Sequence, residues 1–143
     1  MSESTELLEF IYENAKMGEK TLPLVIGAVS RPDLRTALSE QLVEYRAIGR
    51  EAESMLHAKG TAPKQPQGWK QAAIQTALEM DLLARGSTRR VAEMMIRGNT
   101  MGTVQMSKRI HTYQYAADER ALQLADRLLK TEENNIEQMK AFL

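Results

Sequence analysis

Four polar residues stand at positions where the surrounding sequence pattern predicts the inside of a helix. They are Glu19, Gln41, Asn99 and Glu132, one in each of four long segments with helical apolar spacing. At about 100° per residue, each falls within the apolar arc of its own segment. Buried carboxylates and amides must find partners, so four of them at one level would hydrogen-bond one another and fix the register of the helices.

The elements that carry these residues are predicted to be helices. Apolar residues recur at spacings of three and four nearly throughout, and the alternation typical of strands is absent. We therefore expect an all-α single domain over 1–143, with helices at about 4–29, 32–59, 69–84, 87–112 and 114–143. Pro32 ends the first helix and begins the second, Gly60 ends the second, and Ser87 is the expected N-cap of the fourth.

The connections between these helices are unequal. Short turns join the first helix to the second and the fourth to the fifth, so each pair should form an antiparallel hairpin. The stretch from Gly60 to Gly86 is far longer than antiparallel neighbours need, and it contains the short helix at 69–84. Such a connection can travel back along the bundle, so that helix 87–112 runs parallel to helix 32–59.

This crossover would bring the four polar residues to one level. Glu19 and Gln41 lie at about the same distance from the Ser30 turn, and Asn99 and Glu132 lie at similar depths from the same end of the bundle. With simple up-and-down connections, Gln41 and Asn99 would instead differ in height by roughly 9 Å. A polar layer therefore closes only in the crossover topology.

Four stretches of the chain carry a likeness to a known superfamily. They are MGEKTLP at 17–23, PDLRTALSEQLVEY at 32–45, VAEMMIRGNTMG at 91–102 and LLKTEENNIEQMKAFL at 128–143. Over essentially its whole length, the sequence resembles the ferritin-like superfamily, in particular uncharacterised bacterial branches related to spore-coat-type helical bundles. The resemblance implies a ferritin-like four-helix bundle with a long crossover that contains a short extra helix.

The resemblance also implies where a metal site would lie. Active members of the superfamily bind two metal ions through one Glu on each of two helices and a Glu-x-x-His motif on each of the other two. The matching positions here are Glu19, Gln41-x-x-Glu44, Asn99 and Glu132-x-x-Asn135. Both histidines are missing, and two carboxylates have become amides. This is a poor ligand set for two iron ions, which need hard anionic oxygens and imidazoles.

From the sequence, two interpretations of these residues stay open. One is a buried, hydrogen-bonded polar layer with a structural role, made up of Glu19, Gln41, Asn99, Glu132 and Asn135. The other is a weak or single-metal site for iron or manganese, made up of Glu19, Glu44 and Glu132. The only histidines, His57 and His111, lie near predicted helix ends and far from this level, so we expect them at the surface.

The segment Val91–Lys108 holds four of the nine methionines and two glycines four residues apart. Its expected inward arc comprises Ala92, Met95, Ile96, Met106 and Ile110. Because methionines spread around a helix do not converge on one metal ion, we expect them to fill the core. Gly98 and Gly102 would let a neighbouring helix approach closely. Met94 and Met101 point nearly opposite, which indicates a contact with helix 69–84 or with a second subunit.

The composition limits the classes of function. The chain has 143 residues, no cysteine, and 19 Lys and Arg against 19 Asp and Glu. No net field therefore draws it to nucleic acid or anionic lipid, and disulfides and thiolate zinc sites are excluded. No apolar run approaches the roughly 20 residues of a membrane span, so we expect no membrane insertion. The acidic N-terminus lacks the order of a signal peptide, so we expect a cytoplasmic protein.

Signatures of catalysis are also missing from the sequence. It has no Gly-rich phosphate loop, nucleophile elbow or His-Glu-x-x-His motif, and no carboxylate pair that its periodicity singles out as acid and base. We therefore expect a non-enzymatic helical-bundle protein with a structural or interaction role, a degenerate di-metal site and no cofactor, which associates as a homo-oligomer. The alternative is a metal-binding or oxidoreductase ferritin relative with a reduced carboxylate ligand set.

Overall fold

The computed structural model describes residues 2–83 and 88–143 of the chain, and it confirms the all-α fold class. Its helices are α1 (Glu3–Ala28), α2 (Pro32–Ala58), α3 (Trp69–Leu83), α4 (Thr88–Tyr113) and α5 (Glu119–Lys140). No strand occurs in the described ranges. No helix in those ranges combines the length and the apolar composition that crossing a membrane requires.

Local signals set most of the helix ends. The Ser2 side chain accepts a hydrogen bond from the backbone N–H of Thr5 at the start of α1, where an N-cap satisfies a free amide. The chain leaves α2 through Gly60, whose φ of +76° suits a residue without a Cβ. The predicted cap Ser87 lies outside the described residues.

The last helix begins later than predicted. Residues 114–117 form a turn after Tyr113, and Asp118 then caps α5 by accepting a hydrogen bond from the backbone N–H of Ala121. The prediction that this helix begins at Gln114 was wrong because the apolar spacing gives no signal for the cap. Leu143, which the predicted helix 114–143 included, lies beyond the end of α5, and its side chain is exposed.

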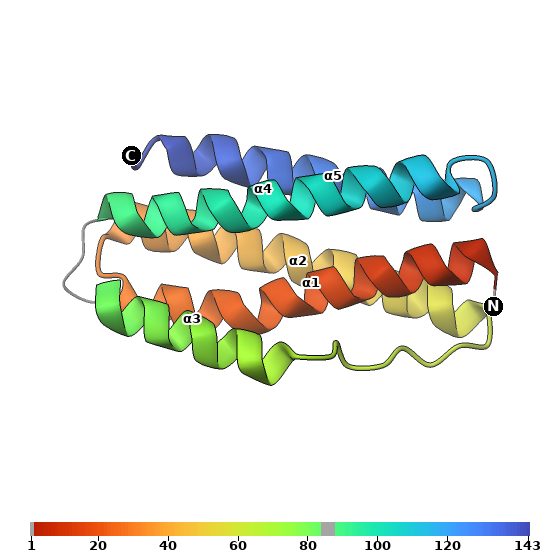
Figure 1. The fold of residues 1–143 in the computed structure, drawn as a ribbon, viewed down its shortest axis with the longest axis horizontal. Coiled ribbons are helices and arrows are strands. Elements are labelled where there is room, and N and C mark those ends of the chain that lie inside the picture. Colours follow the sequence, from red (N-terminus) through yellow and green to blue (C-terminus); the bar gives the residue numbers. More distant parts are fainter. Residues whose placement is uncertain (1, 84–87) are drawn as a thin grey trace.

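The five helices form two antiparallel hairpins and a returning crossover (Figure 1). The first hairpin is α1 with α2, and the second is α4 with α5. The loop after α2 and helix α3 run back along the bundle, with α3 beside α1, so α2 and α4 point in the same direction. The short helix thus packs on its own bundle through α1, and the connection returns as the unequal lengths predicted.

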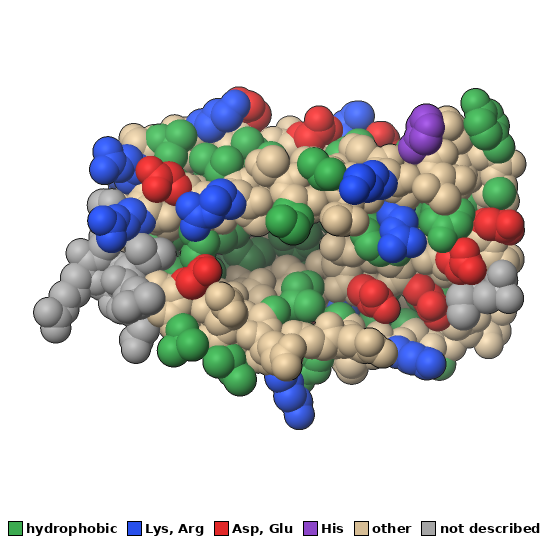
Figure 2. Space-filling view, viewed as in Figure 1, with side chains coloured by type: hydrophobic (Ala, Val, Ile, Leu, Met, Phe, Trp, Pro, Cys, Tyr) green, Lys and Arg blue, Asp and Glu red, His purple; other side chains and the backbone are tan. Residues whose placement is uncertain are grey.

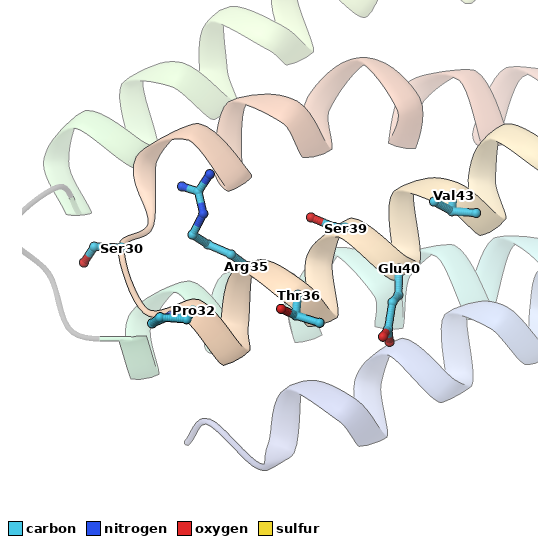
Figure 3. A pocket seen from close by; sticks show the side chains of 7 residues that line it. All are labelled: Ser30, Pro32, Arg35, Thr36, Ser39, Glu40 and Val43. Carbon is cyan, nitrogen blue, oxygen red and sulfur yellow. The ribbon is translucent and has the colours of Figure 1, made fainter.

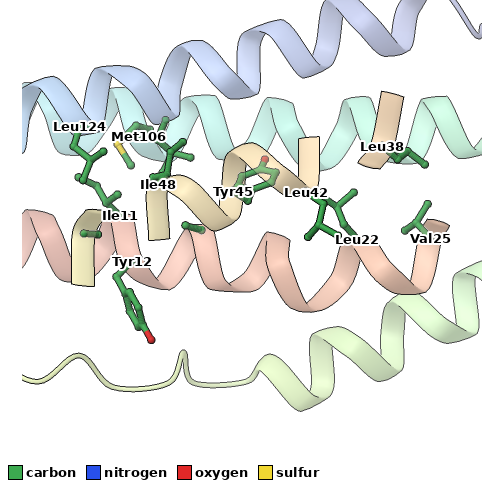
Figure 4. Close-up of a cluster of buried hydrophobic side chains, with 14 of the residues drawn as sticks. Ile11, Tyr12, Leu22, Val25, Leu38, Leu42, Tyr45, Ile48, Met106 and Leu124 are labelled. Atoms are coloured by element: carbon green, nitrogen blue, oxygen red, sulfur yellow. The ribbon is translucent and has the colours of Figure 1, made fainter. Parts of the chain in front are cut away.

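The core follows the apolar stripes of α1, α2 and α5. Its largest fully buried side chains include Leu7, Leu8, Ile11, Leu38, Ile48 and Leu128. Burying one such side chain contributes roughly 1.5–3 kcal/mol, so this cluster dominates the stability of the bundle. In Figure 4, Ile11, Ile48 and Leu124 lie between the helices, whereas Tyr12 points from α1 toward the loop that precedes α3.

Candidate functional site

A cavity of about 600 Å³ opens between α1, α3 and α4. In the space-filling view it is the hollow between α4 above and α1 with α3 below, and apolar side chains lie inside it (Figure 2). Tyr45 from α2 and Glu132 from α5 also line it. Its apolar and thioether lining comes from Met17, Leu22, Val25, Met94, Met95 and Met101.

The glycines of α1 and α4 make room for side chains around this cavity. At Gly102, an added Cβ would overlap the carboxyl group of Glu132, and at Gly18 it would lie 2.9 Å from the ring of Tyr45. At Gly98, an added Cβ would meet nothing within 4 Å. The expected close approach of a neighbouring helix was wrong at Gly98, which faces the cavity, whereas at Gly102 the Glu132 side chain of the neighbouring helix α5 occupies the space.

A buried polar network lies beside the cavity. The Tyr45 hydroxyl donates to Oδ1 of Asn99 at 3.2 Å, and Nδ2 of Asn135 donates to the Tyr45 hydroxyl at 3.3 Å and to Oδ1 of Asn99 at 3.2 Å. Burial raises the pKa of the Tyr45 phenol, so the hydroxyl stays protonated and remains a donor. Asn99 and Asn135, both expected in the polar layer, are thus joined through Tyr45.

Glu132 is the buried polar side chain that has no hydrogen bond or ion pair with the described residues of this site. Its side chain belongs to a residue that is 6 % exposed, and its carboxyl group lines the cavity next to Gly102. Within the described part of the chain, nothing donates a hydrogen bond to it or forms an ion pair with it. Burial raises the pKa of the Glu132 carboxyl from 4.5 to about 8, because low polarity disfavours the charged form. The group is therefore mostly protonated at neutral pH.

Two of the other residues predicted for the layer lie elsewhere. Gln41 is buried as expected, but its Nε2 donates to Oε1 of Gln138 at 2.9 Å, outside the Tyr45 network. Glu19 was wrongly placed in the buried layer: its side chain is 27 % exposed and pairs with Lys16 at 3.0 Å and Arg46 at 3.9 Å. It lies at the edge of the apolar arc of α1, where cations of α1 and α2 reach it.

Glu44 lies on the outer seam between α2 and α5. Both of its oxygens accept from the guanidinium of Arg127, at 2.8 and 3.2 Å, and Thr131 donates to it at 3.4 Å. The hydrogen bonds from Arg127 lower the pKa of the Glu44 carboxyl. Glu44 is thus a surface ion-pair partner with no direct contact to the cavity lining.

The three carboxylates that were candidates for a metal site are therefore not gathered. Glu19, Glu44 and Glu132 each have separate surroundings, and no group of three or more His, Asp or Glu side chains in the described ranges could hold a metal ion. His57 and His111 are exposed, as predicted. The metal-site interpretation receives no support from this arrangement.

The methionines of α4 divide between the core and the cavity. Met106 is buried in the core, as predicted. Met95 and Ile96, which were also expected inside, are only half-buried, and Met95 lines the cavity because no helix covers α4 there. Met94 and Met101 line its mouth, together with Thr76 and Glu79 of α3. The further contact expected for Met94 and Met101 is thus a shared cavity with α3.

A second depression, of about 690 Å³, lies on the outer face of α2 (Figure 3). Its lining residues are Ser30, Pro32, Arg35, Thr36, Ser39, Glu40 and Val43, all of them exposed. The guanidinium of Arg35 turns away to the end of α1, where it donates to the carbonyls of Ile26 and Val29. This depression is therefore a shallow surface feature, and the cavity between α1, α3 and α4 is the candidate site.

Tyr45 is the residue of this site that the sequence did not single out. It lies within the apolar stripe of α2, where the sequence pattern does not distinguish it from a core residue, although a buried hydroxyl group needs a partner. Its position four residues after Gln41, on the same face of α2, is the available signal. Comparisons of the chain with protein-family models, curated proteins and solved structures found no match.

Proposed function

We propose that this protein is a non-enzymatic binding protein whose cavity between α1, α3 and α4 holds a small, largely apolar molecule. The observation that carries the proposal is the cavity itself, about 600 Å³ in volume, whose lining combines apolar and thioether side chains of α1 and α4 with polar side chains. Pockets for small molecules in proteins typically measure about 300–1,000 Å³ and combine an apolar lining with a few placed polar groups.

The cost of leaving this space empty supports a ligand. Protein interiors are close-packed, and side chains that line a void lose contacts on one side. Met17, Leu22 and Val25 of α1 face the cavity from one wall, and Met94 and Met95 of α4 face it from the other. A molecule with an apolar body would restore contacts to both walls.

The polar groups around the cavity suit binding better than catalysis. General acid–base chemistry needs paired groups within hydrogen-bond reach of a reacting atom. Asn99, Asn135 and Tyr45 are committed to one another, and Glu132 has no second titratable side chain hydrogen-bonded to it. These groups can orient a ligand, and no pair of them forms a proton relay.

Binding of Nile red, a neutral apolar fluorophore, tests this proposal. Gly98→Phe should fill the mouth of the cavity, because Gly98 lines it and has free space around its Cα. Gly27→Phe is the matched control. Like Gly98, Gly27 is an exposed helical glycine, and a Cβ added to it would meet nothing within 4 Å, but it lies in α1 and does not line the cavity. We expect saturable binding that weakens at least about ten-fold in Gly98→Phe and stays unchanged in Gly27→Phe. Equal binding by both variants, or no saturable binding, would disprove the proposal.

We also propose that the bundle is ferritin-like and that its metal site has degenerated. The parallel course of α2 and α4 supports the first part, and the hydrogen bond between Asn99 and Asn135, two positions that match metal ligands in the superfamily, supports the second. After incubation with Fe(II) or Mn(II) and dialysis, the protein should retain far less than one ion per chain. Near-stoichiometric metal that is lost in Glu132→Ala would support the metal-binding alternative instead.

Self-association is a second candidate role, favoured by the outer face of α3. Ile74 and Leu78 lie one turn apart on this face and are 61 % and 60 % exposed. Neighbouring exposed apolar side chains are common at contacts between subunits. Sedimentation of the protein and of an Ile74→Asp, Leu78→Asp variant tests this role, because an oligomer formed through α3 should dissociate in the variant.

A further inference from the structure

Four of the side chains that line the cavity donate a hydrogen bond back to their own helices. Each donates to the backbone carbonyl four residues earlier at 2.8 Å: Asn14 to Phe10, Thr21 to Met17, Thr76 to Ala72 and Asn99 to Met95. The proton of the Tyr45 hydroxyl is used as well, since it is donated to Asn99. One donor of each of these side chains is thus held in an internal bond, whereas the exposed side chains of Arg97 and Gln105 at the rim make no such bond within the described ranges.

Glu132 has the opposite character. Its carboxyl group lines the same cavity, is part of a residue that is more than nine-tenths buried, and receives no hydrogen bond from the described side chains or backbone. Among the described residues, the fully buried side-chain atom without a partner is Gln41 Oε1, whereas the oxygens of Glu132 open onto the cavity, where a bound molecule can reach them. The protonated carboxyl group can both donate and accept a hydrogen bond, whereas the carboxylate only accepts, so a ligand that carries a cationic donor is matched by the carboxylate form.

Charged and titratable side chains from four helices line the cavity. Glu132 comes from α5, Tyr45 from α2, Glu79 from α3 and Arg97 from α4, while α1 contributes uncharged lining side chains only. Arg97 is exposed, so its guanidinium can stay in solvent at the rim. Glu79 is half-buried and is the acidic side chain on the α3 side.

We propose that the cavity binds an amphipathic organic amine, whose ammonium group donates to the Glu132 carboxylate while its apolar body lies between the walls of α1 and α4. This inference rests on the proposed binding function and names the class of ligand. The polarisable thioethers of Met17, Met94 and Met95 line the space that the apolar body would fill. A hydrogen-bonded ion pair in such a site is stronger than a bond between neutral groups.

Binding of an amine should release a proton. Burial holds the pKa of the Glu132 carboxyl at about 8, so this group carries its proton in most molecules at pH 7. A neighbouring ammonium group favours the carboxylate and lowers that pKa. The carboxyl proton then passes to the buffer as the complex forms, and the amine keeps its own proton. A neutral ligand leaves the carboxyl protonated and releases nothing.

Titration calorimetry with n-octylamine and n-octanol tests the inference, because the two molecules share the same alkyl chain. At pH 7 we expect octylamine to bind at least about ten-fold more tightly than octanol, as one charge-assisted hydrogen bond implies. Titrations in two buffers of different ionisation enthalpy should reveal the release of up to one proton per octylamine bound, and none per octanol.

Three variants assign the effect to one carboxyl group. Glu132→Gln should abolish both the preference for octylamine and the proton release, while still binding octanol. Gly102→Ala should weaken the preference, because its Cβ would displace the Glu132 carboxyl. Glu133→Gln is the matched control, since Glu133 is exposed on the neighbouring position of α5 and its removal should change neither result.

The possible results separate this inference from the function on which it rests. Equal affinity for the two ligands, or a preference that survives Glu132→Gln, would overturn the amine assignment while leaving the binding cavity in place. Tighter binding of octanol than of octylamine, without proton exchange, would also overturn the amine assignment. It would indicate a ligand that accepts a hydrogen bond from the protonated carboxyl group. If neither ligand binds or displaces Nile red, the binding function itself fails.

Discussion

Acidic side chains have partners at the seam between α2 and α5, whereas Glu132 at the cavity beside α4 has none in the described structure, although α5 contributes to both places. Along the seam, Arg127 pairs with Glu44 and Glu51, and Thr131 also donates to Glu44. Toward the cavity, Glu132 follows Thr131 directly in the sequence and has no partner among the described residues. Two acidic groups close to the same helix thus have lowered and raised pKa values.

The difference shows what a polar residue in a helical bundle requires. At the seam, a residue of the facing helix lies opposite each charge, so the polar groups stabilise one another at the surface. At the cavity, no helix covers Gly98, and the neighbouring helices supply hydroxyl and amide groups that bond to their own backbones. A carboxyl group placed there is costly to the fold, which is typical of functional sites.

The largest expected effect is a stabilisation by Glu132→Gln. Between pH 4.5 and about 8, the folded protein keeps a proton on Glu132 that the unfolded chain has released, so its free energy of unfolding falls as the pH rises through this interval. Gln carries no charge and avoids this loss. The variant should therefore be more stable by on the order of 3–5 kcal/mol above pH 8 and nearly equal to the parent below pH 4.5.

Urea unfolding at pH 4, 7 and 9 measures this difference directly. Glu133→Gln provides the control, because Glu133 is exposed and its substitution should give a difference that is small at every pH. A Glu132→Gln variant that is less stable than the parent at pH 9 would mean that the carboxylate has a stabilising partner, and the contrast between seam and cavity would disappear.

An intermediate effect is expected from alanine substitutions of two glycines. Gly18→Ala would place a Cβ 2.9 Å from the buried ring of Tyr45, so the ring must shift and the protein should lose about 1–3 kcal/mol. Gly98→Ala faces the open cavity and should instead gain roughly 0.5–1 kcal/mol, because Ala favours a helix over Gly. Opposite signs in urea unfolding would confirm that α4 is uncovered at Gly98. Equal losses would show that another group packs there.

The helices and the crossover could be predicted from the sequence because they depend on local spacing and on the length of one connection. Apolar residues at three-and-four spacing define each helix, and Pro32 and Gly60 mark the two ends of α2. The burial of Gln41, Asn99, Glu132 and Asn135 also follows from the angle of each residue on its helix.

The cavity could not be predicted in the same way, because a helical angle does not say which neighbour covers a residue. Met95 has an inward angle on α4, but no helix lies over it. Glu19 has a similar angle on α1, but it lies where Lys16 and Arg46 can reach it. The hydroxyl of Tyr45 was hidden within an apolar stripe, and only the positions of Asn99 and Asn135 in space identify its role.

The smallest expected effect is the opposite sign for the same substitution at the seam. Glu44→Gln removes a carboxylate that pairs with Arg127. In the parent protein, Arg127 lowers the pKa of Glu44, so the folded state holds fewer protons than the unfolded chain as the pH falls below 4.5. The ion pair stabilises the fold above that value and is lost in acid. Both side chains are more than one-third exposed, so we expect a destabilisation of only about 0.5–1 kcal/mol at pH 7.

Arg127 also pairs with Glu51 at 2.9 Å, which keeps the loss small in Glu44→Gln. Added salt should reduce the difference further, because it screens charges at the surface. Urea unfolding at pH 7 with and without 0.5 M NaCl, and again at pH 3, is the measurement. A stabilisation at pH 7 would place Glu44 in the same class as Glu132, and the pairing across the seam would then cost more in desolvation than it contributes.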